Sequence, residues 1–367
     1  MKRRDFIRAA GVGLPAAAVL ATPAIAQERP EIRWRMTSHA PRSLDTIFGS
    51  ADYFAQKLSE ITDGRFQIET FAAGEIVGAL QGLEAAQNNT VECAQTCSFY
   101  FVGRDPAFAF GTSLPFALNT RTLNAWQYGE GMELLNEFYK GYNIYGLPFG
   151  NTGTQTGGWF RREISTVSDL NGLKYRIGGL AGQILTKLGV VAQQIPGADI
   201  YPSLERGTID GAEWIGPYDD ERLGLQKVAP YYYYPGWWEG GTTIHLFINL
   251  DAWNSLPASY QSALKVAAEA ANQWMLVRYD NQNPDALRRL VEAGAQLRPF
   301  SQEIMTASFE AAVDLYTEIA ATNEKFRKLL DSVSAYRDDA LAWMQTAEYH
   351  YDTFTFRNRR NPLYRSS

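Results

Sequence analysis

Short apolar strand patterns alternate with amphipathic helix patterns through most of this chain, and this alternation limits the fold more than any single motif. The segment Phe66–Phe71 (FQIETF) alternates apolar and polar residues with a period of two, which is typical of a half-buried strand. Strand and helix patterns in this order predict a mostly parallel sheet with helices on its faces. We expect strands at 32–38, 66–71, 91–96, 144–149, 174–177, 190–193 and 244–248, and helices at 43–61, 77–87, 180–188, 200–206, 257–293, 309–330 and 336–356.

The N-terminus has the pattern of an export signal. Two arginines, Arg3 and Arg4, precede a stretch rich in small apolar residues, and Ala24-Ile25-Ala26 has the small-x-small form of a cleavage site. We expect residues 1–26 to be a twin-arginine signal peptide that is removed, with an ordinary Sec signal as the alternative. Both interpretations predict export to the periplasm.

Composition excludes several classes of protein. A chain of 367 residues usually divides into about two domains, and an apolar fraction of 46% is ample for their cores. The net charge of −6 is unsuited to a nucleic-acid phosphate backbone, so we expect no nucleic-acid partner. After residue 26 no segment approaches eighteen uncharged apolar residues, and we expect a soluble exported protein.

Only two cysteines occur, Cys93 and Cys97. On an extended strand their Cα atoms would lie roughly 13 Å apart, which is beyond the reach of a disulfide. Two thiols without neighbouring histidines also make a poor zinc site. We interpret both as small buried apolar residues, with a bridge on a helix as the alternative.

Arg176 is the clearest candidate for recognising an anion. It ends an expected strand in the segment GLKYRIGG (172–179), which then opens into glycines before a helix. In open α/β sheets, ligands bind beyond the carboxyl ends of strands. A guanidinium there can hold a carboxylate with two parallel hydrogen bonds, which lysine cannot reproduce. A surface arginine at a strand end is the alternative.

Two further segments suggest a small-molecule pocket. The polar run 151–158 (NTGTQTGG) is by itself a loop, but its amides could serve a ligand oxygen or a metal. The segment 201–245 sets aromatic rings and Glu213 among glycines, which is typical of a pocket wall. Carboxylate and amide oxygens together suit a hard cation.

Other charged and titratable residues receive structural interpretations. Asp219-Asp220-Glu221 is interpreted as a solvated helix face or as a charge cluster at a helix N-terminus. The histidines His39, His245 and His350 are too scattered to form a catalytic or metal cluster, so each is expected to be structural.

Several segments together resemble the solute receptors of tripartite ATP-independent periplasmic (TRAP) transporters, the DctP family. They are FAQKLSEITDGRFQIETFAAGEIVG (54–78), Leu114-Pro115-Phe116, GLKYRIGG (172–179) and LERGTIDGAEW (204–214). The segments NTGTQTGGWFRREI and WIGPYDDERLG are similar to those of the α-keto acid receptors in that family. The matches fall along essentially all of the mature chain.

The resemblance implies a non-enzymatic receptor that binds a small 2-oxo or 2-hydroxy monocarboxylate beside a sodium ion and delivers it to TRAP membrane subunits. Calcium replaces sodium in a close branch, and no organic cofactor is implied. The arginine that pairs with the substrate carboxylate would be Arg176, with Asn151 adding a hydrogen bond. The other implied substrate-binding residues are Gln155, Trp214, Phe99 and Tyr100, and the implied metal ligands are Gln155, Glu213, the carbonyl of Trp214 and, as a fourth, Glu239.

The implied fold class is α/β, a two-lobed periplasmic solute-receptor fold in which helices flank a mixed sheet in each lobe and long C-terminal helices brace the lobes. Approximate boundaries are 27–153 plus 244–295 for lobe 1 and 154–243 plus 296–338 for lobe 2. Residues 339–367 form a C-terminal helical extension with many aromatic residues. This extension could fold back on its own lobe or pack against a second copy of the chain as a homodimer.

Two other functions stay open. One is a periplasmic lyase or hydrolase that acts on a carboxylated substrate with Glu213 as the base. The other is a receptor for lactate or sugar acids.

Overall fold

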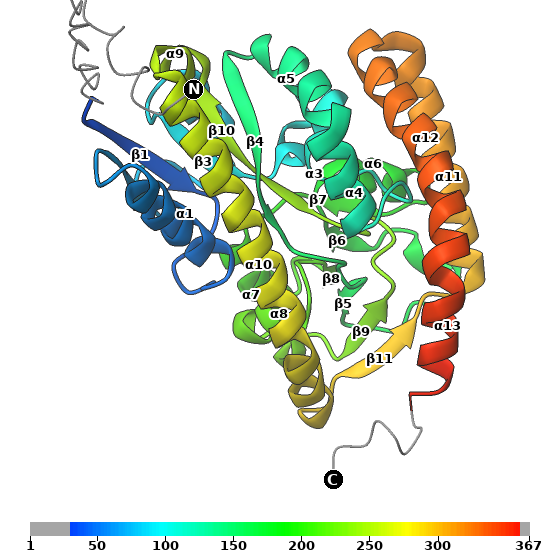
Figure 1. The fold of residues 1–367 in the computed structure, drawn as a ribbon. Helices are drawn as coiled ribbons and strands as arrows, with labels where there is room; N and C mark the ends of the chain where they lie inside the picture. The colour runs from blue at the N-terminus through cyan, green and yellow to red at the C-terminus, as the bar shows by residue number, and fades with distance from the viewer. Residues whose placement is uncertain (1–29, 360–367) are drawn as a thin grey trace, which may run out of the picture. The chain divides into compact units, whose positions relative to one another are not determined.

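Two mixed β-sheets organise the computed structural model, which describes residues 30–359 (Figure 1). The first sheet has the order β2 (Phe66–Phe71), β1 (Ile32–Ser38), β3 (Cys93–Thr96), β10 (Thr243–Asn249), β4 (Ile144–Asn151). The second has the order β11 (Gln296–Pro299), β9 (Tyr231–Tyr234), β5 (Gly158–Phe160), β8 (Gly211–Ala212), β6 (Lys174–Arg176), β7 (Val191–Gln193). The expected signal peptide at 1–26 lies outside the described residues.

Each sheet combines parallel and antiparallel neighbours. In the first sheet β1 is parallel to β2 and β3, and β10 is antiparallel to β3 and β4. In the second sheet β5 is antiparallel to β8 and β9, whereas β6 is parallel to β7 and β8. The carboxyl ends of β1, β3 and β4 therefore lie at the same end of the first sheet as the start of β10. Likewise, the carboxyl ends of β6, β8 and β9 lie at the same end of the second sheet as the start of β5.

Helices cover both sheets, and long helices follow them in the sequence (Figure 1). The α-helices are α1 (Ile47–Ile61), α2 (Gly82–Gln87), α3 (Ala109–Thr112), α4 (Thr120–Trp126), α5 (Met132–Lys140), α6 (Gly179–Lys187), α7 (Gly197–Glu205), α8 (Pro217–Leu223), α9 (Leu250–Ser255), α10 (Ala258–Glu292), α11 (Gln302–Thr322), α12 (Glu324–Met344) and α13 (His350–Arg357). Short helical turns are η1 (Ser98–Phe101), η2 (Pro106–Phe108), η3 (Gln127–Gly131), η4 (Val167–Leu170), η5 (Leu225–Lys227) and η6 (Gln345–Tyr349). None of the helices between residues 30 and 359 is long and apolar enough to span a membrane.

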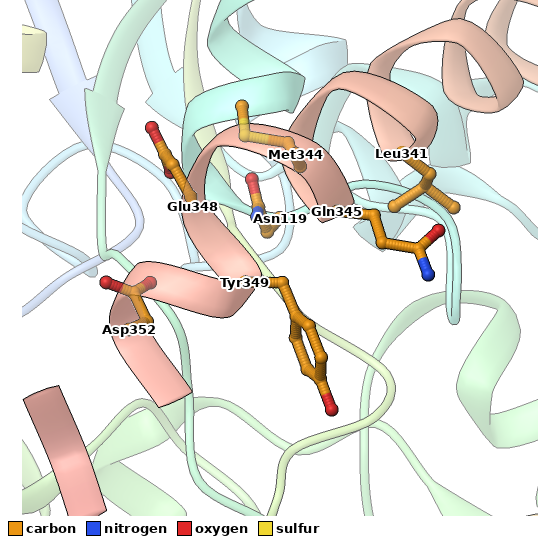
Figure 2. Close-up of a pocket in the computed structure, with 7 residues that line it drawn as sticks. All are labelled: Asn119, Leu341, Met344, Gln345, Glu348, Tyr349 and Asp352. Carbon is orange, nitrogen blue, oxygen red and sulfur yellow. The ribbon is translucent and has the colours of Figure 1, made fainter. Parts of the chain in front are cut away.

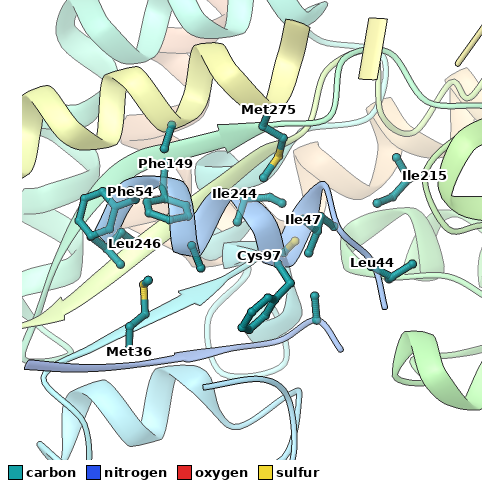
Figure 3. Packing of buried hydrophobic residues seen from close by; sticks show 14 of the residues in the cluster. Met36, Leu44, Ile47, Phe54, Cys97, Phe149, Ile215, Ile244, Leu246 and Met275 are labelled. Carbon is teal, nitrogen blue, oxygen red and sulfur yellow. The ribbon is translucent and has the colours of Figure 1, made fainter. Parts of the chain in front are cut away.

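The core of the first sheet is formed by α1 and α10 packing on the strands. Phe54 of α1 contacts Phe149 of β4 edge to face, with ring centroids 5.0 Å apart, and both side chains are fully buried. Figure 3 shows Met275 of α10 and Met36 of β1 around the same cluster. Cys97 belongs to this core, and both cysteines are free and buried, as predicted.

The α/β class, the mixed sheets and the long C-terminal helices are confirmed. The mostly parallel sheet expected from the alternation of strands and helices is wrong, because β10 and β5 each run antiparallel to both of their neighbours. Some predicted boundaries are also wrong. The helix predicted at 77–87 begins only at Gly82, because Gly78 and Gln81 form a turn in which the Gln81 side chain accepts from the Gly78 N–H. The helices predicted at 309–330 and 336–356 instead meet at Asn323. Its side chain accepts a hydrogen bond from the Phe326 N–H at 2.9 Å and so caps α12, which continues through 331–335.

The interpretation of Asp219 and Asp220 as a solvated face is wrong, because both carboxylates are buried on α8. The alternative, a charge cluster at a helix N-terminus, is confirmed, since both residues lie in the first turn of α8. Asp219 accepts from the Tyr279 hydroxyl of α10 at 2.7 Å, and burial raises its pKa to about 7. Asp220 accepts from Trp159 Nε1 at 2.9 Å and from the Tyr232 hydroxyl at 2.8 Å, and burial raises its pKa to about 6. These carboxylates attach α8 to α10 and to the second sheet.

Burial of Asp219 predicts that the folded chain becomes less stable as the pH rises from about 4 to about 7. The unfolded chain loses this proton near its ordinary pKa of 3.8, whereas the folded chain keeps the proton up to about pH 7. The stabilisation that Asp219 contributes to the folded chain is therefore complete below pH 3.8 and is lost as the pH rises through about 7. Asp219→Asn should flatten this fall and raise the free energy of unfolding near neutral pH, as measured by urea unfolding across this range.

The control for this experiment is Asp199→Asn, because Asp199 is exposed on α7. It should leave the pH dependence unchanged. If the free energy of unfolding of Asp219→Asn fell with pH as steeply as that of the wild type, the retained proton would not belong to Asp219.

Candidate functional site

A small buried cavity lies where the carboxyl ends of the strands of both sheets meet. The first sheet and its neighbouring segments contribute His39, Ile47, Cys97, Phe99, Tyr100, Thr152 and Ile244. The second sheet and its connections contribute Gln155, Arg176, Glu213, Trp214, Ile215, Glu239 and Thr242. The cavity volume of about 20 Å³ is room for about one water molecule. Any larger ligand needs the walls to separate before it can enter.

Arg176 is the last residue of β6 and is almost completely buried. Its Nη1 donates to the Glu213 carbonyl oxygen at 2.8 Å and to the Glu213 carboxylate, and its Nε donates to the Ile195 carbonyl oxygen at 3.0 Å. The guanidinium carbon also lies 5.1 Å from the centre of the Trp214 ring. Three directed contacts therefore fix a positive charge at the strand end.

The electrostatics of the cavity are set by burial of this charge with two carboxylates. Burial acts to lower the pKa of Arg176, but the neighbouring charges, Glu213 first, outweigh it and raise the pKa. Burial raises the pKa of Glu213, and Arg176 opposes this shift. Burial, followed by repulsion from Glu213, raises the pKa of Glu239 well above its usual range. The site combines one fixed cation with two carboxylates that gain from a further positive charge.

The side chain of Gln155 is oriented by two threonine hydroxyls. The Thr242 hydroxyl donates to Glu239 and the Thr152 hydroxyl donates to the Gly153 carbonyl oxygen, so each can only accept from Gln155. Gln155 Nε2 donates to the Thr152 hydroxyl at 3.1 Å and to the Thr242 hydroxyl at 3.0 Å. These two hydrogen bonds fix the orientation of the Gln155 amide, with its nitrogen directed at the two threonine hydroxyls.

Two buried oxygens on the cavity wall have no hydrogen-bond partner among the described residues: Gln155 Oε1 and Glu213 Oε2. Buried oxygens are normally paired, and a neutral amide oxygen beside a carboxylate oxygen is a donor set that hard cations such as Na⁺ and Ca²⁺ accept. The residues present therefore fit a cation. Within residues 30–359 no group of three or more His, Cys, Asp or Glu side chains could hold a metal, so this donor set depends on the amide.

The side of the cavity nearest the first sheet is aromatic and uncharged. Phe99 and Tyr100 lie in η1, directly after β3, with their rings edge to face at 5.0 Å. A Cβ at Gly178 would come within 2.5 Å of the Phe99 ring, so the glycine allows the Arg176 loop to reach it. His39 Nδ1 lies 3.2 Å from the Gln95 carbonyl oxygen, and burial lowers the histidine pKa to about 4, which keeps it neutral.

Of the residues singled out in the sequence, the cavity brings together Arg176, Gln155, Glu213, Trp214, Glu239, Phe99 and Tyr100. Asn151 does not line it. Its Oδ1 accepts from the Gly153 N–H at 2.8 Å, and its Nδ2 donates to Asn124 at 3.4 Å, which shapes the loop before Gln155. The four tyrosines at 231–234 form β9 and do not line this cavity either.

Sequence reasoning missed His39, Cys97, Thr152 and Thr242 as cavity residues. The first three directly follow the carboxyl ends of β1, β3 and β4, so the strand-end rule applied to Arg176 would have found them. Thr242 precedes β10, the reversed strand of the first sheet, and no local signal distinguishes it.

The chain is similar to known proteins over nearly its whole length. Residues 37–323 match the bacterial extracellular solute-binding proteins of family 7. A monocarboxylate 2-oxoacid-binding periplasmic protein of Nostoc sp. is 46% identical over 96% of this chain and 99% of its own length.

Two solved structures are also similar. A TRAP transporter solute-binding protein from Bordetella bronchiseptica is 48% identical over 89% of this chain and 98% of its own, with a TM-score of 0.88, and is described as a mixed-occupancy dimer with calcium and picolinate. A TRAP periplasmic solute-binding protein from Pseudoalteromonas atlantica, with bound sodium and pyruvate, is 38% identical over 88% of this chain and 98% of its own, with a TM-score of 0.84.

Proposed function

Because the chain belongs to family 7 of the bacterial extracellular solute-binding proteins, we propose that it is a TRAP transporter receptor that binds a small 2-oxo monocarboxylate, such as pyruvate, together with a cation. The observation that carries this proposal is a buried arginine at a strand end in the same small cavity as two residues with unpartnered buried oxygens, Gln155 and Glu213. An arginine and a cation are what a 2-oxo acid requires, since its carboxylate and its 2-oxo oxygen are both acceptors.

Ligand binding would exchange the partners of the Arg176–Glu213 ion pair. A buried carboxylate is costly unless it is paired, and the guanidinium offers it two parallel hydrogen bonds. Glu213, released from Arg176, would hold the cation with Gln155 Oε1 and the Trp214 carbonyl oxygen, with Glu239 as a fourth candidate. The cation supplies a positive charge that orients the 2-oxo or 2-hydroxy oxygen. Sodium and calcium both suit these ligands.

The two sheets would belong to two lobes that close on the ligand. The lobes are residues 27–153 plus 244–295 and residues 154–243 plus 296–338. The chain crosses between the sheets at 152–157 and 235–242 and from α10 into β11. The small cavity volume supports a closed form from which the lobes separate by a hinge motion. The closed, loaded receptor would then deliver its ligand to TRAP membrane subunits from the periplasm, after export by the twin-arginine route.

The C-terminal extension supports a homodimer. Trp343, Tyr351, Phe354 and Phe356 are between 61% and 71% exposed. A surface pocket of about 440 Å³ runs along this part of the chain, and Figure 2 shows residues that line it, among them Leu341, Met344 and Tyr349 of the extension and Asn119. Large exposed aromatic surface usually marks an interface. We propose that this surface packs against a second copy of the chain.

Arg176→Lys should retain the fold and lose most of its affinity for pyruvate. A single ammonium cannot replace the planar guanidinium, and the loss is on the order of 2–5 kcal/mol, about 30-fold or more. Isothermal titration calorimetry measures it, with Arg298→Lys at an exposed ion pair to Glu163 as the control. Near-wild-type affinity would remove Arg176 from the site, and consumption of pyruvate during the titration would favour the enzyme alternative.

Affinity for pyruvate should depend on a cation. Chelated and desalted protein should bind pyruvate more weakly, and sodium or calcium should restore the affinity. Glu213→Gln should abolish this restoration because an amide cannot offset the charge of the cation, whereas Glu163→Gln, at an exposed position, should not. Wild-type affinity that is independent of cations would contradict the metal site and leave the receptor assignment standing.

Charges placed on the C-terminal extension should separate the proposed dimer. Light scattering should report twice the chain mass for the wild type and one chain mass for the double variant Trp343→Glu, Phe354→Glu. Both side chains are exposed, so the fold should persist. Val266→Glu on α10, where the valine is 53% exposed, is the matched control. A monomeric wild type would show that the extension stays with its own chain.

A further inference from the structure

A network of polar contacts joins two segments of the chain that continue from residues on the two sides of the cavity. On one side, Ser43 and Asp45 lie in the loop after β1, between His39 and Ile47, which both line the cavity. On the other side, Tyr218 and Arg222 lie on α8, which follows the cavity residues Glu213, Trp214 and Ile215. The network thus joins two segments that are continuous with opposite walls, although none of these four residues lines the cavity.

Asp45 is the centre of this network. Its two carboxylate oxygens accept from the Tyr218 hydroxyl at 3.1 Å and 3.2 Å. Arg278 Nη2 of α10 donates to Asp45 at 2.8 Å, while Arg278 Nε donates to the Thr46 hydroxyl at 3.0 Å. The carboxylate therefore connects the loop to α8 and to the long helix α10.

Arg222 provides a second connection between α8 and the loop after β1. Its Nε and Nη2 donate to the Ser43 carbonyl oxygen at 3.1 Å and 2.9 Å, and its Nη1 donates to the Tyr218 hydroxyl at 3.2 Å. Its Nε also lies 3.7 Å from Asp45 Oδ1. Five contacts of this kind between two short segments form a cooperative unit, in contrast to a single exposed ion pair.

We propose that Asp45, Tyr218 and Arg222 form a latch that holds the two sides of the cavity together and thereby controls how long a ligand stays bound. This inference rests on the proposed receptor function, because it assumes a ligand that enters when the walls separate. The latch residues do not touch the ligand. They position the walls that do.

The partial exposure of the latch sets the size of its effect. The side chains of Asp45, Arg222 and Arg278 are 38%, 37% and 32% exposed, so water competes for these contacts. Loss of one latch contact should therefore accelerate ligand dissociation by about 3- to 10-fold. Association should change less, because the open form does not make these contacts.

The experiment compares Asp45→Asn and Tyr218→Phe with the wild type by stopped-flow tryptophan fluorescence, since Trp214 lines the cavity. Both variants should release pyruvate faster, with a matching rise in Kd, and the double variant should be less than additive. The control is Asp52→Asn, because Asp52 is exposed on α1, lies outside the latch and accepts a hydrogen bond from the Thr70 hydroxyl. Wild-type dissociation rates in both latch variants would overturn the latch and leave the receptor assignment intact.

Small-angle X-ray scattering tests the latch without a ligand. The unliganded variants Asp45→Asn and Tyr218→Phe should have a larger radius of gyration than Asp52→Asn. If the wild type binds no 2-oxo acid, the proposed function fails, and this measurement then decides the latch alone. Equal radii of gyration in all of these proteins would overturn it.

Discussion

The site depends on the ion pair between Arg176 and Glu213, buried where the two sheets meet. A guanidinium at this depth persists only because a carboxylate and two carbonyl oxygens face it. Removing one partner leaves an uncompensated charge, whereas exchanging partners does not. An anion and a cation that enter together would preserve the charge balance, and this constraint explains why the cavity pairs an arginine with oxygens suited to a metal.

The strand-helix alternation and the strand-end rule predicted much of this arrangement. Phe66–Phe71 is a strand at the predicted bounds because its period-two pattern is local. The position of Arg176 at the carboxyl end of β6 follows from the same kind of reasoning. The roles of Gln155, Glu213 and Trp214 came from the resemblance to a family, and they stay predictions here, as do the lobe boundaries.

The rest could not be predicted because it depends on residues distant in sequence. The run of acidic residues at Asp219 and Asp220 favoured a solvated helix face. However, Asp219 bonds to Tyr279, which is 60 residues away, and Asp220 bonds to Trp159, which is 61 residues away. The orientation of Gln155 depends on Thr242, which is 87 residues away and belongs to another connection. The helix break at Asn323 does have a local signal, since asparagine is a strong N-cap, but the apolar periodicity around it gave no reason to stop.

The position of β10 also has a consequence for how the chain folds. This strand lies between β3 and β4 in the first sheet, although residues 243–249 follow all of the second sheet except β11 in sequence. The central pairing of the first sheet therefore joins residues about 150 apart along the chain, as in Cys93 with Ile248. Such nonlocal pairings raise the contact order and slow folding. The N-terminal half of the chain therefore cannot complete its own sheet during synthesis. The edges of β3 and β4 that face β10 stay unpaired until residues 243–249 have been synthesised.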